Sequence, residues 1–237
     1  MRIRGSGSQV VRDEFSVMTE KMDFVGAEVL ELGCGGAARA EQIAKQTEVA
    51  SIIAAEIDLV AHRKNLEKSI EKVEFASFGA QAIPLQDESV DIVIMLKSLH
   101  HVPQPLMSQS LQEIHRILRV GGVAYLSEPV FQGALNEVIR LFHDEESVRK
   151  FAFDAIAESI ELGLFHLTEE YFYLSPVRML SFDQFREGIM DATYQDHEAD
   201  EDLVSEVRAR FESYRSKDLE TPFYFETPNR VDLLKKL

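Results

Sequence analysis

The sequence predicts an α/β fold in which a mainly parallel sheet carries helices on both faces. Strand-like apolar runs alternate with helical patterns through the first 130 residues, as expected of parallel strands joined by helices. The run at 90–96 is almost continuously apolar, which is typical of a central strand buried on both faces. A glycine-rich turn at 33–36 joins the first strand to the next helix. Sheets of this kind bind ligands at such turns.

Each element of this half has its own local signal. In the N-terminal helix, Val11, Phe15, Met18 and Met22 are spaced to share one face. Asp58 is placed to cap the helix that follows the second strand. In chain order we expect a helix over 10–24, a strand over 27–32, a helix over 37–46, strands over 51–56, 73–78 and 90–96, a helix from 107 that ends at Gly121-Gly122, and a strand over 123–128.

After residue 130 the pattern becomes mostly helical. Helical spacing occurs in 131–163, 181–190 and 199–214, and an aromatic segment at 167–174 could form a strand. The segment 223–234 reads as a strand pair or as one strand bent at Pro228. The expected organisation is an N-terminal lead and helix (1–24), an α/β core (25–130), a helical cap inserted before the last strand or strands (131–220) and a C-terminal strand that completes the sheet (221–237).

Composition restricts the class of protein. A chain of 237 residues with 45% hydrophobic content can bury the core of one α/β domain with an appendage. A net charge of −16 argues against general affinity for nucleic acids or anionic membranes. No apolar run reaches the roughly 20 residues that span a bilayer. A cytoplasmic location is therefore expected, and the single cysteine, Cys34, fits a reducing compartment and is expected to pack in the turn.

Glu31 distinguishes two classes of ligand for the glycine turn. Residues 33–38 match the G-x-G-x-x-G/A fingerprint of dinucleotide sites, in which the helix start holds a pyrophosphate. A carboxylate two residues before Gly33 would repel a pyrophosphate and would favour a positively charged ligand, such as a sulfonium or an ammonium. Glu56 ends the second predicted strand, where a carboxylate can accept hydrogen bonds from ribose hydroxyls. The alternative for Glu56 is an exposed loop acid.

Four segments in order resemble the class I S-adenosylmethionine-dependent methyltransferases, which have a Rossmann-like fold. The resemblance is strongest to the small-molecule subfamily that includes ubiquinone and menaquinone biosynthesis enzymes. It covers about residues 25–130, and the C-terminal hundred residues match no family pattern. The four segments are the glycine turn (31–37), the ribose-binding segment (55–58), the adenine loop (80–91) and the segment after the fourth strand (99–105) together with the helix end at 113–122.

The resemblance implies S-adenosylmethionine as cofactor and transfer of its methyl group by in-line displacement. One position departs from the family, because Gly79 stands where an acidic residue usually accepts from the adenine amine; Gln81 or a backbone carbonyl would have to replace it. The cofactor-binding residues that the resemblance implies are Glu31, Gly33, Cys34, Gly35, Glu56, Ile57, Ala80, Gln81, Met95 and Leu96.

A hydroxyl acceptor would need a base, and three candidates follow the carboxyl ends of predicted strands. They are His100, His101 and Glu128. The alternative for each histidine is a packing role in its loop. The methyl donor is intrinsically reactive, so no metal ligands are expected. Other polar residues are expected at the surface or in the cap, namely Lys97, His143, His166 and His197.

The acceptor is expected to be a small molecule chosen by the cap, and the sequence leaves a homodimer open. Methylation of tRNA or protein is one alternative, and a non-catalytic cofactor-binding protein is another. A nicotinamide-dependent oxidoreductase is disfavoured by Glu31 and by the lack of a Tyr-x-x-x-Lys pair. Aromatic residues of the cap could enclose a planar or hydrophobic acceptor, or form the cap's own core; they are Phe142, Phe151, Phe153, Phe165, Tyr171, Phe172 and Tyr173.

Overall fold

The computed structural model describes residues 1–191, 200–218 and 220–237. Within these residues, strands from both halves of the chain form one sheet. The strands are β1 (Glu28–Leu32), β2 (Ser51–Ala55), β3 (Val73–Ala76), β4 (Val90–Leu96), β5 (Leu118–Pro129), β6 (His166–Met179) and β7 (Phe223–Lys235).

Helices fill most of the connections between the strands. They are α1 (Glu14–Lys21), α2 (Ala38–Gln46), α3 (Leu59–Leu66), η1 (Leu99–His101), α4 (Gln104–Ile117), α5 (Ala134–Ile139), α6 (Glu146–Glu161), α7 (Phe182–Phe185), η2 (Arg186–Met190) and α8 (Glu201–Glu212). As predicted, Asp58 caps α3, because its side chain accepts hydrogen bonds from the backbone N–H groups of Val60 and Ala61.

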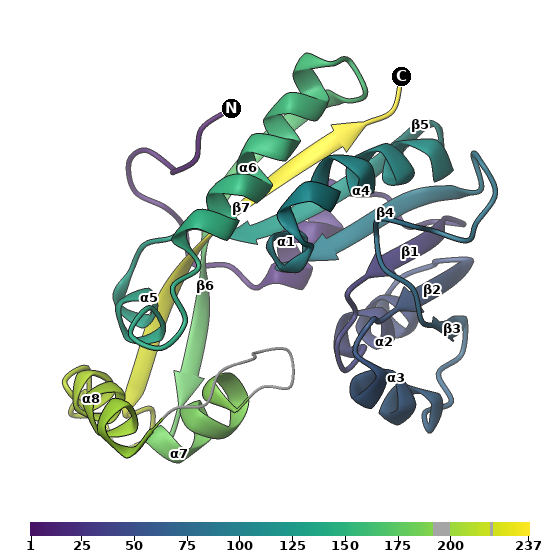
Figure 1. Ribbon diagram of the computed structural model, residues 1–237. Helices are drawn as coiled ribbons and strands as arrows, with labels where there is room; N and C mark the ends of the chain where they lie inside the picture. The colour runs from purple at the N-terminus through teal and green to yellow at the C-terminus, as the bar shows by residue number, and fades with distance from the viewer. Residues whose placement is uncertain (192–199, 219) are drawn as a thin grey trace.

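The strand order of the sheet is β3-β2-β1-β4-β5-β7-β6 (Figure 1). The first five strands are parallel, whereas β7 runs antiparallel to β5, and β6 antiparallel to β7. The predicted α/β class and mainly parallel sheet are confirmed. The order reverses between β1 and β4, which marks the point where an open parallel sheet forms its ligand site.

Apolar residues cover both faces of the sheet, because successive side chains of a strand point to opposite sides. In β1, Leu30 joins the cluster made with α4 and α6, including Leu111 and Ile156. Its neighbour Val29 joins the cluster on the other face, where α1 and α2 contribute residues such as Met18. The helices therefore lie on both faces, as predicted.

Several boundaries differ from the predicted ones. The N-terminal helix is shorter than 10–24, and Val11 lies outside it, where it forms an isolated parallel bridge with Leu174. The helix expected to reach Gly121-Gly122 ends at Ile117, and both glycines lie within β5. The segment 223–234 belongs to one strand that continues through Pro228, so the strand pair is excluded.

A long two-stranded arm carries the C-terminal helices (Figure 1). Residues of β7 from Asn229 onward pair with β5 as well as β6, whereas Phe223 to Pro228 pair with β6 alone. Aromatic residues of α7 and α8 pack against this free half, with Phe211 at the centre of the cluster. The segment predicted as a helical cap therefore includes a sheet strand, β6. In the described part of the chain, no helix is long and apolar enough to span a bilayer.

Candidate active site

A cavity of about 610 Å³ opens at the carboxyl ends of the parallel strands. This volume lies in the range of small-molecule sites. One end is formed by the predicted cofactor segments, including Gly33, Glu56 and Ala80. The other end is formed by residues from the cap, including Leu135 and Ile189. The cavity therefore joins the two halves of the chain.

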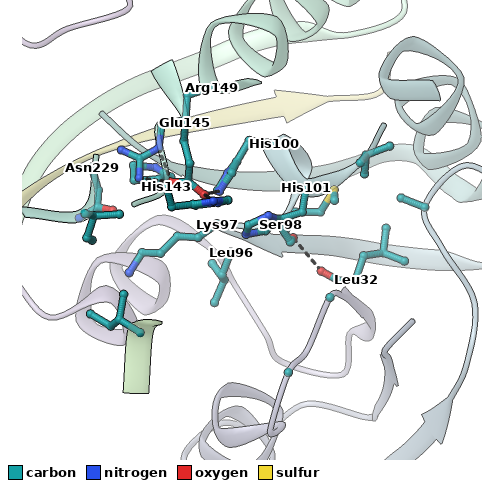
Figure 2. A pocket seen from close by; sticks show the side chains of 18 of the residues that line it. Leu32, Leu96, Lys97, Ser98, His100, His101, His143, Glu145, Arg149 and Asn229 are labelled. Carbon is teal, nitrogen blue, oxygen red and sulfur yellow. Dashed lines mark hydrogen bonds and ion pairs between the residues drawn. The ribbon is translucent and has the colours of Figure 1, made fainter. Parts of the chain in front are cut away.

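The turn after β1 keeps its backbone open toward this cavity. Gly33 (φ +73°) and Gly35 (φ +53°) both have left-handed backbones, which favour glycine. A Cβ atom on Gly33 would lie 2.7 Å from Cβ of Ser98. The Ser98 hydroxyl donates a hydrogen bond to the Leu32 carbonyl (3.0 Å), which ties the β1 and β4 ends together (Figure 2).

Glu56 links the glycine turn to the end of β2. One carboxylate oxygen accepts a hydrogen bond from the Gly35 N–H (2.6 Å), and the other accepts one from the Asp58 N–H (2.8 Å). A carboxylate oxygen can accept more than one hydrogen bond, so each retains acceptor capacity for a ligand hydroxyl. Glu56 lines the cavity and is buried, which excludes the alternative of an exposed loop acid.

Glu31 and Cys34 lie behind the turn and are not among the described residues that line the cavity. Burial raises the pKa of Glu31 to about 7, against the opposing effect of Arg39, and in the described part of the chain its Oε2 has no hydrogen-bond partner. Burial also raises the pKa of Cys34 to about 12, so the thiol stays protonated at neutral pH. Cys34 is therefore a packed residue, as expected.

Gln81 occupies the space above Gly79. A Cβ atom on Gly79 would lie 2.4 Å from Oε1 of Gln81 and 2.8 Å from its Nε2. Both residues line the cavity. Arg116 on α4 holds the rest of this loop by donating hydrogen bonds to the carbonyls of Ile83 and Leu85 (2.8 Å each). A fixed loop thus places the Gln81 amide where an acidic side chain at position 79 would lie.

His100 sits between two carboxylates at the far end of the cavity. Its Nδ1 hydrogen-bonds to Glu128, and its Nε2 lies 3.6 Å from Oε1 of Glu145, which precedes α6. Nε2 of His143 lies 3.1 Å from the same oxygen of Glu145, and Arg149 pairs with the other oxygen (Figure 2). His100, Glu128 and Glu145 are all buried. The end of β5 and the cap therefore position one histidine of η1 from both sides.

The charges of this cluster act differently on the two adjacent histidines. Burial opposes protonation of His100, but Glu128 and Glu145 outweigh it and raise its pKa to about 9. Burial and the neighbouring His100 lower the pKa of His101 to about 4. For Glu128 and Glu145, burial opposes ionisation, but positive neighbours lower both pKa values. Of the three predicted bases, Glu128 contacts His100 and is not among the described cavity-lining residues.

Several residues that sequence reasoning missed line the cavity. Lys97, expected in solvent, lines it with a left-handed backbone (φ +55°), and its Nζ lies 4.0 Å from Glu14. His143, expected at the surface or in the cap, lines it beside Glu145. No sequence motif marked Glu145 or Arg149, although their i,i+4 spacing on a helix start was readable. His166 is exposed at the start of β6, and His197 lies outside the described residues.

Most of the cap aromatics pack in hydrophobic clusters away from the cavity. None of the seven predicted residues is among the described residues that line the cavity. Phe142 packs in the cap cluster, Phe151 and Phe165 pack in the cluster under α6, and Tyr173 packs under α1. The cap side of the cavity is instead lined by aliphatic residues, namely Leu135, Ile139, Val177 and Ile189. Of the seven, only Phe142 belongs to the cap's own core, and four belong to the clusters that cover the sheet, namely Phe151, Phe165, Tyr171 and Tyr173.

The comparisons agree with the fold. Residues 30–126 match the methyltransferase domain family. Over 105 residues the chain is 31% identical to the ubiquinone biosynthesis O-methyltransferase of Ruegeria pomeroyi, a match that covers 44% of this chain and 42% of that protein. Over 124 residues it is 28% identical to the methyltransferase GfsG of Streptomyces halstedii. This match covers 50% of this chain and 44% of that protein. The matches thus span less than half of each of these relatives.

Structural similarity extends further along the chain. A Bacillus halodurans protein provisionally assigned as a methyltransferase, BH2331, superposes with a TM-score of 0.64 at 19% identity. The match covers 94% of this chain and 98% of that one. At this identity the similarity shows the fold alone. The family match is therefore limited to residues 30–126, whereas the similarity of fold extends over most of the chain.

Proposed function

We propose that this protein transfers a methyl group from S-adenosylmethionine to a small-molecule acceptor held under the cap. One observation carries the proposal, namely a single cavity that joins the family's cofactor segments to a buried His-Glu cluster. The cofactor would supply an activated methyl group, so the protein's own tasks are alignment and exclusion of water.

The residues at the β1 and β2 ends fit this cofactor. A left-handed Gly35, whose Cβ would meet no described atom within 4 Å, leaves room for a bulky ligand. Glu56 has acceptor capacity for ribose hydroxyls, and the unpartnered Oε2 of Glu31, behind the turn, suits an ammonium reached through a bridging water. Gln81 and Ala80 would meet the adenine, and Met95 and Leu96 would line the route toward the acceptor.

The cap end is suited to a mostly apolar acceptor with a few polar groups. Its aliphatic wall is interrupted by Asn136 and Asn229, both buried. Among the described residues, Nδ2 of Asn136 and Oδ1 of Asn229 have no hydrogen-bond partner, so they offer one donor and one acceptor to an occupant. We propose that His100 and His101 face the acceptor's reacting oxygen and that Glu128 is a positioning residue.

Calorimetry with S-adenosylmethionine, S-adenosylhomocysteine and NAD tests the cofactor assignment. We expect the first two to bind and NAD to give no heat of binding. Binding of NAD alone would overturn the proposal. Turnover with a panel of phenols, amines, carboxylates and thiols then separates a methyltransferase from a protein that only binds the cofactor. Methylated product should form with members of one acceptor class, and a failure on every class would favour a binding protein.

The contact between Gly79 and Gln81 allows a test of how the protein would bind the adenine of the cofactor. Gln81→Ala should weaken cofactor binding about 2–10-fold, because it removes one hydrogen-bonding group. Gly79→Asp in the same chain should restore affinity, since the space left by the Gln81 amide can then hold the carboxylate that the family usually places there. Calorimetric Kd values for the single and double variants measure this. Equal affinity of Gln81→Ala and the unchanged protein would show that Gln81 does not contact the cofactor.

We expect cofactor binding to depend on pH because of the raised pKa of Glu31. Its pKa is raised to about 7, and a bound ammonium would lower it, so binding must release a proton below that pH. Apparent affinity should therefore rise about tenfold from pH 6 toward a plateau above pH 7. The charged groups that act on Glu31 are Arg39 of α2 and Glu56. Calorimetry across this range measures the effect, and Glu31→Gln should bind more weakly with a flatter profile.

A further inference from the structure

Two histidines and a carboxylate converge at the acceptor end of the cavity. His100 and His101 are consecutive residues of η1, and Glu145 lies directly before α6. Each offers one potential ligand atom, and these atoms all lie within 4.8 Å of one another. All three residues line the cavity. Two imidazole nitrogens and one carboxylate oxygen are the donor set of several catalytic zinc sites, which keep a fourth position open.

Neighbouring residues already orient two of these ligands. Glu128 holds Nδ1 of His100, so the other ring nitrogen, Nε2, is turned toward Glu145. Arg149 pairs with Oε2 of Glu145, so Oε1 faces the histidines, 3.6 Å from Nε2 of His100 and 3.1 Å from Nε2 of His143. Arg149 is in turn fixed by a hydrogen bond from its Nη1 to Asn136 (3.0 Å). A carboxylate on the far nitrogen of a histidine is the usual support of a metal-bound imidazole, because it sets the ring's orientation and tautomer.

We propose that His100, His101 and Glu145 bind a divalent transition-metal ion of the Zn²⁺ type, with an open position toward the acceptor. The nitrogen-rich donor set disfavours Mg²⁺ and Ca²⁺, which prefer oxygen ligands. The site is completed only when the loop before α6 lies against η1, so the ion would connect the α/β core to the cap. No metal ligands are expected from the sequence, because the methyl donor is intrinsically reactive, and Glu145 is not among the site residues predicted from it.

The proposal deepens the proposed function, on which its catalytic consequence rests. An acceptor hydroxyl at the open position would have its pKa lowered, and its proton would leave to solvent. The oxygen would then attack the methyl carbon, forming the C–O bond while the C–S bond breaks, to give the methyl ether and S-adenosylhomocysteine. The ion would thereby remove the need for an unpaired base beside the acceptor.

Metal titration of the full chain tests the site without reference to activity. After treatment with a chelator, the protein should bind one equivalent of Zn²⁺ by calorimetry. Co²⁺ in place of Zn²⁺ should give the intense visible absorption of a four-coordinate ion. Failure to bind either ion above the level of the His101→Ala, Glu145→Gln double variant would overturn the proposal.

Single variants separate ligands from residues that only support them. His101→Ala and Glu145→Gln should each abolish the Co²⁺ spectrum, and Glu128→Gln should weaken Zn²⁺ binding about 10–100-fold. His166→Ala is the matched control, because this exposed histidine at the start of β6 does not line the cavity. Its affinity for Zn²⁺ should equal that of the unchanged protein. Equal affinity in Glu145→Gln would contradict the proposal.

Cofactor binding by the same preparations distinguishes the two proposals. S-adenosylmethionine bound without any metal site would leave the proposed function standing and overturn the metal site. A metal site with no cofactor binding would overturn the proposed function and leave the metal site standing. Where both are present, chelation should lower turnover on a hydroxyl acceptor, and Zn²⁺ should restore it.

Discussion

Gly33→Ala should lower the affinity for S-adenosylmethionine by about tenfold or more and also reduce stability. A left-handed backbone costs a residue with a Cβ atom roughly 1–2 kcal/mol, and Gly33 has φ +73°. The added Cβ would also lie 2.7 Å from Cβ of Ser98. The turn or the end of β4 must move to relieve this contact, and both form the cofactor end of the cavity. Calorimetry for binding and thermal unfolding for stability measure the two effects.

Gly26→Ala is the control for this variant. Gly26 also has a left-handed backbone (φ +66°), it precedes β1, and a Cβ atom there would meet no described atom within 4 Å. It should lose a similar roughly 1–2 kcal/mol of stability from the backbone alone, while cofactor affinity stays unchanged. If the two variants lost affinity equally, the effect at Gly33 would be one of general stability and the placement of the cofactor turn would be wrong.

Phe211→Ala should cost about 3–5 kcal/mol of stability, concentrated in the cap. Phe211 is fully buried in α8, and its ring centroid lies 4.2 Å from that of Phe223 and 4.9 Å from that of Phe185. The cap cluster is separate from the two clusters that cover the sheet. We therefore expect amide hydrogen exchange to rise in α7 and α8 while β1 to β5 stay protected.

Tyr224→Ala provides the comparison for the cap variant. Tyr224 lies on the same strand, next to Phe223, but it is 40% exposed, and Arg178 lies over its ring. Its removal should change stability by no more than about 1 kcal/mol. Phe211→Ala should also keep cofactor affinity while losing turnover, because the cap forms the acceptor wall. Loss of cofactor affinity in Phe211→Ala would show that the cap also supports the cofactor end.

The residues at the proposed cofactor end of the cavity could be predicted to lie together because their signals are local in the sequence. Gly33, Glu56 and Gln81 each follow or lie beside a strand with a clear apolar pattern, and the parallel fold brings strand ends together. Eight of the ten predicted cofactor residues line the cavity; Glu31 and Cys34, in the described part of the chain, do not. Glu31 and Cys34 were predicted to bind the cofactor because they lie in or beside the turn. Successive side chains of β1 point to opposite faces, however, and that of Glu31 points to the face covered by α1 and α2.

The acceptor half could not be predicted, because its residues come together only in three dimensions. Glu145 and His143 lie in a loop that no motif marks. Glu145, which His143 contacts, meets His100 only when α6 packs beside η1. The cap aromatics had the composition of a binding wall, but sequence spacing cannot tell a core face from a cavity face. Aliphatic residues such as Leu135 and Ile189 carry no signal that separates them from ordinary core.

The position of β7 within the sheet has a consequence for biosynthesis. β7 lies between β5 and β6, although its residues are made after both of them. While the ribosome is still translating the chain, β5 has an open edge, and β6 has no partner strand in the described part of the fold. The α/β core can assemble early from contacts close in sequence, whereas the cap must wait until residues 223–235 emerge. The nascent protein could thus hold a nearly complete cofactor turn before any acceptor wall exists, and its exposed β5 edge would then be the segment most in need of a chaperone.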